Sequence, residues 1–294
     1  MNSKKVPENL PLLVLILVNF TWGLDFIAIE YMVKFLPASM IAFTRLLIGS
    51  ICMISFSLIK NRGIRIAKKD MPRIFFCGAV GLSLYYTVEP IGIGMTSGSM
   101  GALIMATVPI FGMTADRILY KKPITKMKVA AILTSILGVF ILLTGGGTED
   151  MKGNLIGIII MFLAALMWTS FIAAVKPLHE SYSVATILTG MFISGLIVST
   201  PIMLLHVGEP MKWTSTTLLL TVLSAVIGVI GGEFGYIFAV GKLSVTLVSL
   251  FENVLPIVTV VFSIILFGQS LTPLQLLGGL IILVSVTSVT LKEE

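Results

Sequence analysis

Residues 94–111 read GMTSGSMGALIMATVPIF, and residues 241–258, which begin 147 positions later, read GKLSVTLVSLFENVLPIV. Under this shift a Gly, a Leu and a Pro coincide, and the matching prolines are Pro109 and Pro256. Self-similarity at a fixed offset is typical of an internal structural repeat. The chain therefore divides into two predicted repeats, 1–146 and 147–294.

The composition excludes a large soluble domain. Of the 294 residues, 56% are hydrophobic and only 12% are charged, and the mean hydropathy is +1.06. A soluble domain has about 25% charged residues. Lipid offers no partner to unpaired backbone groups, so each apolar run long enough to cross a bilayer is predicted to be a helix. There are ten such runs: 10–33, 38–59, 72–95, 98–119, 126–145, 154–175, 184–206, 216–240, 244–267 and 273–291.

The basic residues set the predicted orientation. Sixteen of the twenty Lys and Arg residues lie in the amino-terminal segment, in alternate connections or at the carboxyl end, and three lie on the opposite side. This asymmetry puts both termini in the cytoplasm. It also explains the net charge of +6 without a nucleic-acid partner. Because five spans per repeat is an odd number, the two repeats are predicted to be inverted, an arrangement that places a solute site at their interface.

Several motifs resemble those of the EamA-type branch of the drug/metabolite transporter superfamily. The resemblance implies ten membrane helices and a secondary transporter of small organic solutes, commonly an exporter. Family members often carry a Glu at the positions that hold Lys122 and Gln269 here, and a Glu directly before the ninth-helix Pro, where Leu255 stands. The motifs are FTWG at 20–23, AFTRLLIGS at 42–50, GMTSGSMGALIMATVPIF at 94–111, KKPITKMKVAAILTSILGV at 121–139, and in the second half SLFENVLPIVTVV and GQSLTPLQLLGG.

Asp25 and Arg45 are charges inside predicted spans, where a charge at the bilayer centre costs about 2.5–3.5 kcal/mol. At about 1.5 Å per residue, Asp25 lies roughly 22 Å from the inner boundary and Arg45 roughly 10 Å from the outer one. In a core about 30 Å thick these depths nearly coincide, so the two are expected to pair. Glu89, also in the outer half, competes for Arg45. The pair is either a structural clamp of the first three helices or a support or gate for a solute site.

Three more carboxyls are candidates for substrate binding or proton coupling: Glu89, Glu233 and Glu252. No Lys or Arg in the sequence evidently reaches Glu233 or Glu252. Two unpaired carboxylates in a dry environment would not both stay ionised, so at least one is expected to exchange protons. The ionised form can hold a cation. For Glu252 the alternative is a side chain in a cytoplasmic water funnel.

Aromatic residues accompany these carboxyls. The shift of 147 places Glu89 over Tyr236 and Glu233 over Tyr86, so each half has a Glu and a Tyr three residues apart, on one helix face. An aromatic ring beside a carboxylate suits an organic cation. Further wall candidates are Trp22, Trp168 and Phe251; for the two tryptophans, which coincide under a shift of 146, ordinary packing is the alternative.

Pro90 and Pro256 are predicted helix breaks, because proline removes a ladder hydrogen bond. In lipid the freed carbonyls need a neighbour or a cavity. We therefore expect Glu89 and Pro90 to face a central cavity rather than lipid.

Together these features predict a proton-coupled exporter of the plasma membrane that works by alternating access. Its solutes are small and organic (amines, amino acids or related metabolites), with cationic solutes favoured. Uptake by the same fold is an alternative, and an intramembrane enzyme or an assembly factor is the alternative of another class. No catalytic residue, cofactor or metal is predicted, since no Cys/His cluster has metal-ligand spacing. The solute, its direction, the proton stoichiometry and the oligomeric state are left open.

Overall fold

The apolar runs fold as helices, in which every backbone polar group finds a partner within its own segment. The computed structural model describes residues 9–59, 65–96, 98–145, 155–267 and 272–293. Within these ranges the regular structure is helical throughout, with no strand.

In the first half of the chain, short connections join the helices. They are α1 (Leu10–Met32), α2 (Ala38–Ile59), α3 (Met71–Phe76), the π-helical segment η1 (Cys77–Leu84), α4 (Tyr85–Met95), α5 (Gly98–Met105), α6 (Val108–Tyr120) and α7 (Lys126–Thr144).

The second half repeats much of this order. Its helices are α8 (Leu155–Val175), the 3₁₀ segment η3 (Lys176–Glu180), α9 (Val184–Leu205), α10 (Ser215–Leu223), the π-helical segment η4 (Ser224–Gly231), α11 (Gly232–Val240), α12 (Val245–Phe251), the 3₁₀ turn η5 (Glu252–Val254), α13 (Leu255–Phe267) and α14 (Pro273–Glu293).

Eight of the described helical segments are long and apolar enough to cross a membrane, and two shorter apolar helices, Val245–Val258 and Pro273–Val289, join them. Large apolar side chains cover much of the outer surface: Leu17 is 65% exposed and Leu205 is 83% exposed. Such a surface suits lipid, because in water it would be an aggregation liability.

Two predicted helix breaks have different outcomes. The expected span 244–267 is interrupted by η5, and Pro256 follows as the second residue of α13. Pro90, in contrast, lies inside α4, which continues to Met95, so the prediction of a break at Pro90 is wrong. The π-helical segment η1 directly before α4 already departs from regular α-helical hydrogen bonding. Helix α4 also packs against α8, and such a neighbour makes a proline inside a membrane helix tolerable.

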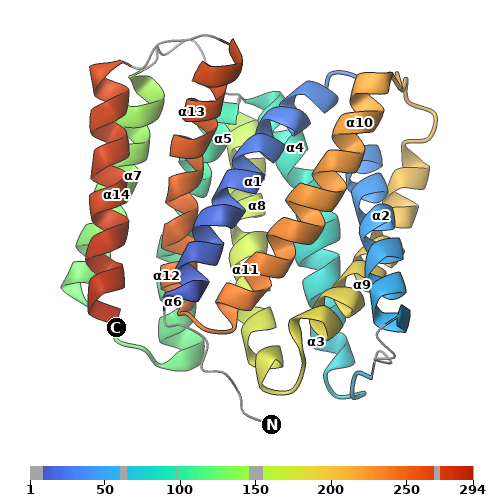
Figure 1. The fold of residues 1–294 in the computed structure, drawn as a ribbon, viewed down its shortest axis with the longest axis horizontal. Coiled ribbons are helices and arrows are strands. Elements are labelled where there is room, and N and C mark those ends of the chain that lie inside the picture. Colours follow the sequence, from blue (N-terminus) through green and yellow to red (C-terminus); the bar gives the residue numbers. More distant parts are fainter. Residues whose placement is uncertain (1–8, 60–64, 97, 146–154, 268–271, 294) are drawn as a thin grey trace.

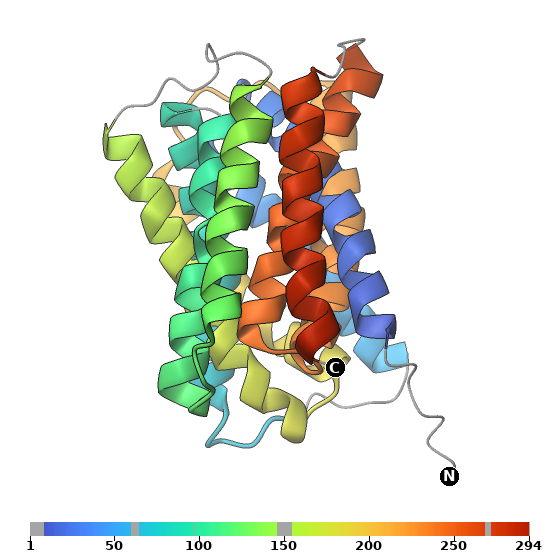
Figure 2. The ribbon, with the colours of Figure 1, turned by 90° about the vertical axis from the view of Figure 1, so that its left-hand side faces the viewer.

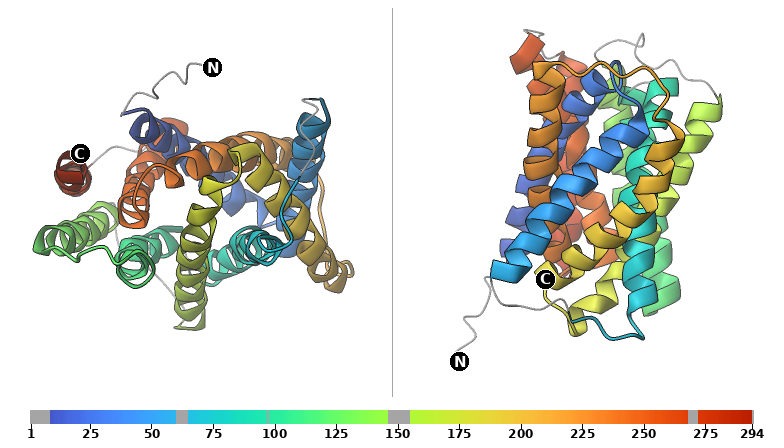
Figure 3. Two further views of the ribbon diagram at one scale, coloured as in Figure 1. Left: turned by 90° about the horizontal axis from the view of Figure 1, so that it is seen from below. Right: turned by 90° about the vertical axis from the view of Figure 1, so that its right-hand side faces the viewer.

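The helices form a bundle with paired edges. Helices α7 and α14 lie side by side at one edge, while α2 and α9 pack together at the other (Figures 1 and 3). Figure 2 shows α7 and α14 running alongside each other over most of their length. Between the edges, α4 packs on α8 and α1 on α11. Helix α1 begins and α14 ends at the same end of the bundle, which is its base (Figure 1).

Candidate functional site

The two π-helical segments each lead directly into a helix that carries candidate site residues. Segment η1 precedes α4, and η4 precedes α11. A π-helical turn contains more residues than an α-helical turn, so it rotates the residues that follow about the helix axis, and such segments are frequent at functional sites. The segments begin at Cys77 and Ser224, 147 positions apart, which is the offset of the sequence match.

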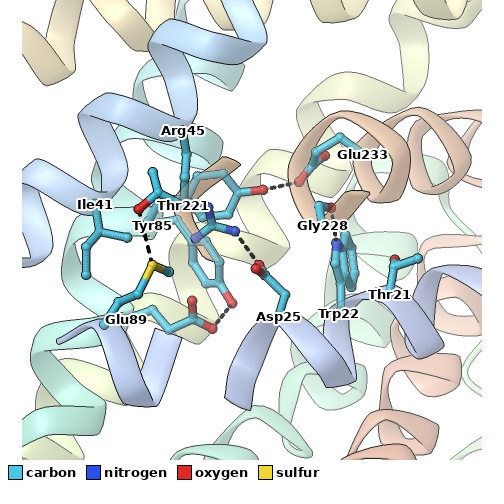
Figure 4. Close-up of polar contacts among 12 residues, drawn as sticks. Thr21, Trp22, Asp25, Ile41, Arg45, Tyr85, Glu89, Thr221, Gly228 and Glu233 are labelled. Carbon is cyan, nitrogen blue, oxygen red and sulfur yellow. Dashed lines mark hydrogen bonds and ion pairs between the residues drawn. The ribbon is translucent and has the colours of Figure 1, made fainter. Parts of the chain in front are cut away.

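Each candidate glutamate accepts a hydrogen bond from a tyrosine. The Tyr85 hydroxyl donates to Glu89 Oε1 at 2.6 Å, and the Tyr86 hydroxyl donates to Glu233 Oε1 at 2.6 Å. Helix α4 therefore holds one carboxyl of its own and one from α11. Figure 4 shows the hydrogen bond between Tyr85 and Glu89.

Glu252 has two donors. The Tyr236 hydroxyl and Trp168 Nε1, the latter at 2.9 Å, both donate to its Oε1. Glu89 and Glu233 are buried, whereas Glu252 is half-buried. Three carboxyls are thus oriented by aromatic donors from α4, α8 and α11.

These pairings differ from the ones that helix periodicity suggests. The three-residue spacing places Tyr86 on the face of Glu89 and Tyr236 on the face of Glu233, but each of these tyrosines donates to a glutamate in another element. A tyrosine side chain is long, so its hydroxyl can reach an acceptor on a neighbouring element instead of one on its own helix. Helical spacing identified the residues but not their partners.

Asp25 and Arg45 form the ion pair expected from their depths. Arg45 Nη2 donates to Asp25 Oδ2, and the two side chains are 2% and 5% exposed. The Arg45 guanidinium carbon also lies 4.6 Å from the centre of the Tyr86 ring, within cation–π range. The pair thereby connects α1 and α2 to the tyrosine that holds Glu233.

Helix α1 approaches η4 and α11 closely because glycines face it. A Cβ at Gly232 would lie 2.3 Å from Trp22 Nε1, and a Cβ at Gly228 would lie 2.7 Å from Asp25 Cγ. Trp22 Nε1 uses this proximity to donate to the Gly228 carbonyl at 3.0 Å (Figure 4). The glycines therefore bring Trp22 and Asp25 into the site.

Trp168 is the centre of an aromatic cluster. Its ring centre lies 4.7 Å from that of Tyr85, 5.3 Å from that of Tyr236 and 5.5 Å from that of Trp22. Trp22 and Tyr236 are also 4.9 Å apart. The tryptophans pack against other rings, as in an ordinary core, and each also donates its N–H to a protein acceptor. Their place in the wall of a solute site stays a prediction.

A cavity of about 50 Å³ lies among these groups, enough for a few water molecules. Helix α4, η5, α13 and the ion pair all contribute to it. The candidate residues that line it are Trp22, Asp25, Arg45, Tyr86, Glu89, Trp168, Glu252 and Pro256. Glu233, Tyr236, Phe251 and Pro90 are outside this lining; Glu233 and Tyr236 contact it through Tyr86 and Glu252.

Among the lining residues that the sequence did not single out as candidates are the polar Asn19 and the flexible Met105, and Tyr85 was noted only as a neighbour of Glu89. Each had a usable signal. Tyr85 is one helical turn before Glu89, and Asn19 is a polar residue one turn before Trp22. Met105 occupies the position 147 residues before Glu252.

The site holds more acid than base. Within the described ranges, no ion pair reaches Glu89, Glu233 or Glu252, and Arg45 is already paired with Asp25. Buried charges require a compensating partner. A proton on the carboxyl, or a cation in the cavity, supplies that compensation.

At the base of the bundle, Asp116 closes a contact between α6 and α12. Its position near the end of the predicted span 98–119 favours a solvated side chain, but that prediction is wrong, because Asp116 is 2% exposed. Its carboxylate accepts from Thr246 N at 2.9 Å and Thr246 Oγ1 at 2.6 Å, and from Val245 N at 3.4 Å. The first N–H groups of a helix have no partner within it, so a buried carboxylate from a neighbouring helix is stabilised there.

Comparison with known proteins places the chain beside membrane transporters. The sequence profile of the EamA-like transporter family matches residues 9–144 and again residues 155–291. An uncharacterized transporter of Archaeoglobus fulgidus is 26% identical over 284 residues, covering 96% of this chain and 99% of the relative. A probable terminal-alkyne amino-acid exporter of Streptantibioticus cattleyicolor is 24% identical over 270 residues, covering 90% of this chain and 88% of the relative. One solved protein structure aligns with a TM-score of 0.80 at 15% identity, covering 95% and 96% of the two chains, which indicates a shared fold.

Proposed function

The chain belongs to the EamA-like transporter family and is a multi-pass membrane transporter, and on this basis we propose that it exports small organic solutes with a cationic group in exchange for protons. The plasma membrane is the proposed location. Among solutes, amines, amino acids and related metabolites fit the site's chemistry. The relative named as a probable amino-acid exporter supports this class.

The proposed architecture is ten spans in two inverted five-helix repeats, 1–146 and 147–294, with both termini in the cytoplasm. The double match to the family profile supports two repeats. So does the equal offset of the two π-helical segments. The hydrogen bond between Tyr86 and Glu233 joins positions that are 147 residues apart, as expected for equivalent residues that meet at a pseudo-two-fold axis.

One observation carries the functional proposal. Glu89 and Glu252 border a central cavity, accept hydrogen bonds from Tyr85, Tyr236 and Trp168, and have no ion-pair partner among the described residues. The aromatic donors orient the carboxyls without neutralising them. A cationic solute and a proton therefore compete for the same groups.

This competition couples two flows. Deprotonated carboxyls bind the solute when the cavity opens to the cytoplasm, and protons entering from outside displace it. Since the cavity of about 50 Å³ holds only water, a solute requires the two halves to separate on one side.

Purified protein in sealed vesicles tests the proposal. With an imposed proton gradient, added amines or amino acids should change the internal pH, and Glu89→Gln and Glu252→Gln should each abolish that change. Glu209→Gln, at an exposed position after α9, is the matched control and should leave it intact. Solute flux that depends neither on the proton gradient nor on the two cavity substitutions would contradict the proposal.

Two alternatives are distinguished by the same preparation. Solute accumulation inside vesicles of known orientation separates uptake from export. Formation of a chemical product without flux would favour an intramembrane enzyme.

A further inference from the structure

A groove of about 640 Å³ runs along the outer surface near the base of the bundle. Helices α6 and α8 form its walls, and Arg73, at the start of α3, lines its base end. Seen from below in Figure 3, α8 lies between α6 and α3, and it contacts both. Among the described residues, the groove shares no lining residue with the central cavity, so it is a separate feature.

The hydroxyl groups that line the groove are satisfied within the protein. Thr114, Thr169 and Ser170 each donate to a carbonyl of their own helix. Tyr120 on α6 donates to the Ala173 carbonyl on α8 at 2.8 Å. A hydroxyl has one proton to donate, and each of these protons is already used. The walls therefore present an apolar surface, which suits a hydrocarbon chain better than a polar solute.

Arg73 is the exception among the polar lining residues. Its side chain is exposed, and its guanidinium has neither a hydrogen bond nor an ion pair with any other described residue. A guanidinium offers five N–H donors in a planar fork, a geometry that matches the oxygens of a phosphate group. The groove thus combines apolar walls with one unused anion-binding group at its base end.

Positive charge gathers around this end. Segment 65–73 contains Arg65, Lys68, Lys69 and Arg73, and segment 117–122 contains Arg117, Lys121 and Lys122. Two neighbouring acids are engaged elsewhere, since Asp70 accepts from the Tyr182 hydroxyl and Asp116 from Thr246 on α12, while Glu180 is exposed. The surroundings of Arg73 are therefore positive overall, as in protein surfaces that contact anionic lipid head groups.

We propose that an anionic phospholipid occupies this groove, with its phosphate on Arg73 and one acyl chain between α6 and α8. The base end of the groove lies where the apolar helices end, which is the depth of the head groups. A zwitterionic lipid also carries a phosphate, but its ammonium group meets the surrounding positive charges. A soluble phosphate lacks the chain that fills the apolar part.

The lipid contacts both halves of the sequence. Helices α3 and α6 belong to residues 1–146, and α8 belongs to residues 147–294. The hydrogen bond from Tyr120 to Ala173 already joins the halves here, and Asp116 joins α6 to α12. A lipid in the groove adds to these contacts, so it should stabilise the folded protein against heat.

Matched ligands test the proposal on the full-length protein in a neutral detergent. Dioleoylphosphatidylglycerol is the anionic lipid, dioleoylphosphatidylcholine has the same chains with a zwitterionic head group, and glycerol phosphate is an anion without chains. Native mass spectrometry and thermal-shift titrations measure binding. The phosphatidylglycerol should bind at least tenfold more tightly than the phosphatidylcholine, and glycerol phosphate should give no shift over the same concentrations.

Two pairs of variants locate the site. Arg73→Gln should remove the tenfold advantage of the anionic lipid and leave phosphatidylcholine binding unchanged. Its control is Arg65→Gln, at an exposed arginine outside the groove lining, which should change neither affinity by more than about twofold. Arg73→Lys keeps the charge and loses the fork, so its affinity should fall in between.

The second pair tests the groove itself. Thr114→Phe places a ring in the groove and should weaken binding of both lipids. Thr287→Phe on α14 is the control, because Thr287 is also exposed and also donates to the carbonyl four residues earlier. It should leave both affinities unchanged. The thermal midpoint without added lipid verifies that each variant is folded.

Several results would overturn the proposal. Equal affinity for the two lipids, or equal losses in Arg73→Gln and Arg65→Gln, would mean diffuse attraction to a basic surface rather than a site at Arg73. Lipid binding that survives Thr114→Phe would exclude the groove. If Thr114→Phe instead disrupts a dimer and leaves lipid binding intact, the groove holds a second copy of the chain. None of these results depends on transport, so the proposed function is tested separately.

Discussion

Tyr86 donates its hydroxyl to a carboxyl that solvent does not reach. Its oxygen lies 2.6 Å from Glu233 Oε1, Glu233 has no exposed surface, and Oε2 lacks a partner within the described part of the chain. Replacing Tyr86 by Phe removes this hydroxyl and keeps the ring, whose centre lies 4.6 Å from the Arg45 guanidinium. The substitution therefore tests one hydrogen bond.

The magnitude depends on the charge of Glu233. A hydrogen bond between neutral groups contributes about 0.5–1.5 kcal/mol, and one to a charged group about 1.5–3 kcal/mol. If Glu233 exchanges a proton, the coupling between the two side chains should rise from the first range to the second as the pH rises. The ionised carboxylate is the stronger acceptor.

A double-mutant cycle measures this coupling free energy. Tyr86→Phe is combined with Glu233→Met, which has a similar shape and no acceptor, and unfolding by a denaturing detergent is followed at pH 5 and pH 9. Tyr31→Phe, at a partly exposed ring on α1, is the control and should change stability by less than about 0.5 kcal/mol.

Two results would refute the reasoning. A coupling of zero at both pH values would mean that the hydrogen bond contributes nothing to folding. An equal, non-zero coupling at both would mean that Glu233 keeps one protonation state, which removes it from the proton-coupling groups.

Three further substitutions have expected outcomes. Gly232→Ala should destabilise the fold by about 1–3 kcal/mol, since its Cβ would lie 2.3 Å from an indole nitrogen, whereas Gly208→Ala, with nothing within 4 Å, should be near neutral in the same detergent unfolding assay. Asp116→Ala should cost at least about 1.5–3 kcal/mol in that assay, because it removes a buried charged acceptor at the start of α12; an unchanged midpoint would contradict the capping role. Trp168→Phe keeps an aromatic ring but removes the N–H that orients Glu252, so vesicle flux should show a severalfold weaker apparent solute affinity, with folding retained.

Much of the secondary structure was predictable because lipid restricts the choices. The predicted span 38–59 coincides with α2, and 72–95 differs by one residue at its start from the continuous segment Met71–Met95. An apolar run in a membrane has to be helical, and its length is set by the bilayer. Depth along a helix follows from residue count, so the pairing of Asp25 with Arg45 was also predictable.

Which side chains contact each other across helices was harder to predict from the sequence. Tyr86 was expected beside Glu89 and instead holds Glu233, and Asp116 was interpreted as solvated and is buried against α12. Both depend on which way a helix faces and which helix lies next to it. The π-helical segments rotate the helices that begin at Tyr85 and Gly232 about their axes. A sequence analysis that assumes regular α-helical periodicity does not account for this rotation.

The amino-acid sequence by itself thus determined that the chain forms apolar helices, how deep each charge lies, and which residue types recur at an offset of 147. Only the tertiary structure decided which tyrosine holds which glutamate and that Glu233 lies behind the cavity lining. Composition and residue spacing specify where a residue lies along the axis of its own helix. Rotation about that axis and contact between helices arise from packing the whole bundle, where small residues such as Gly228 and Gly232 allow neighbours to approach.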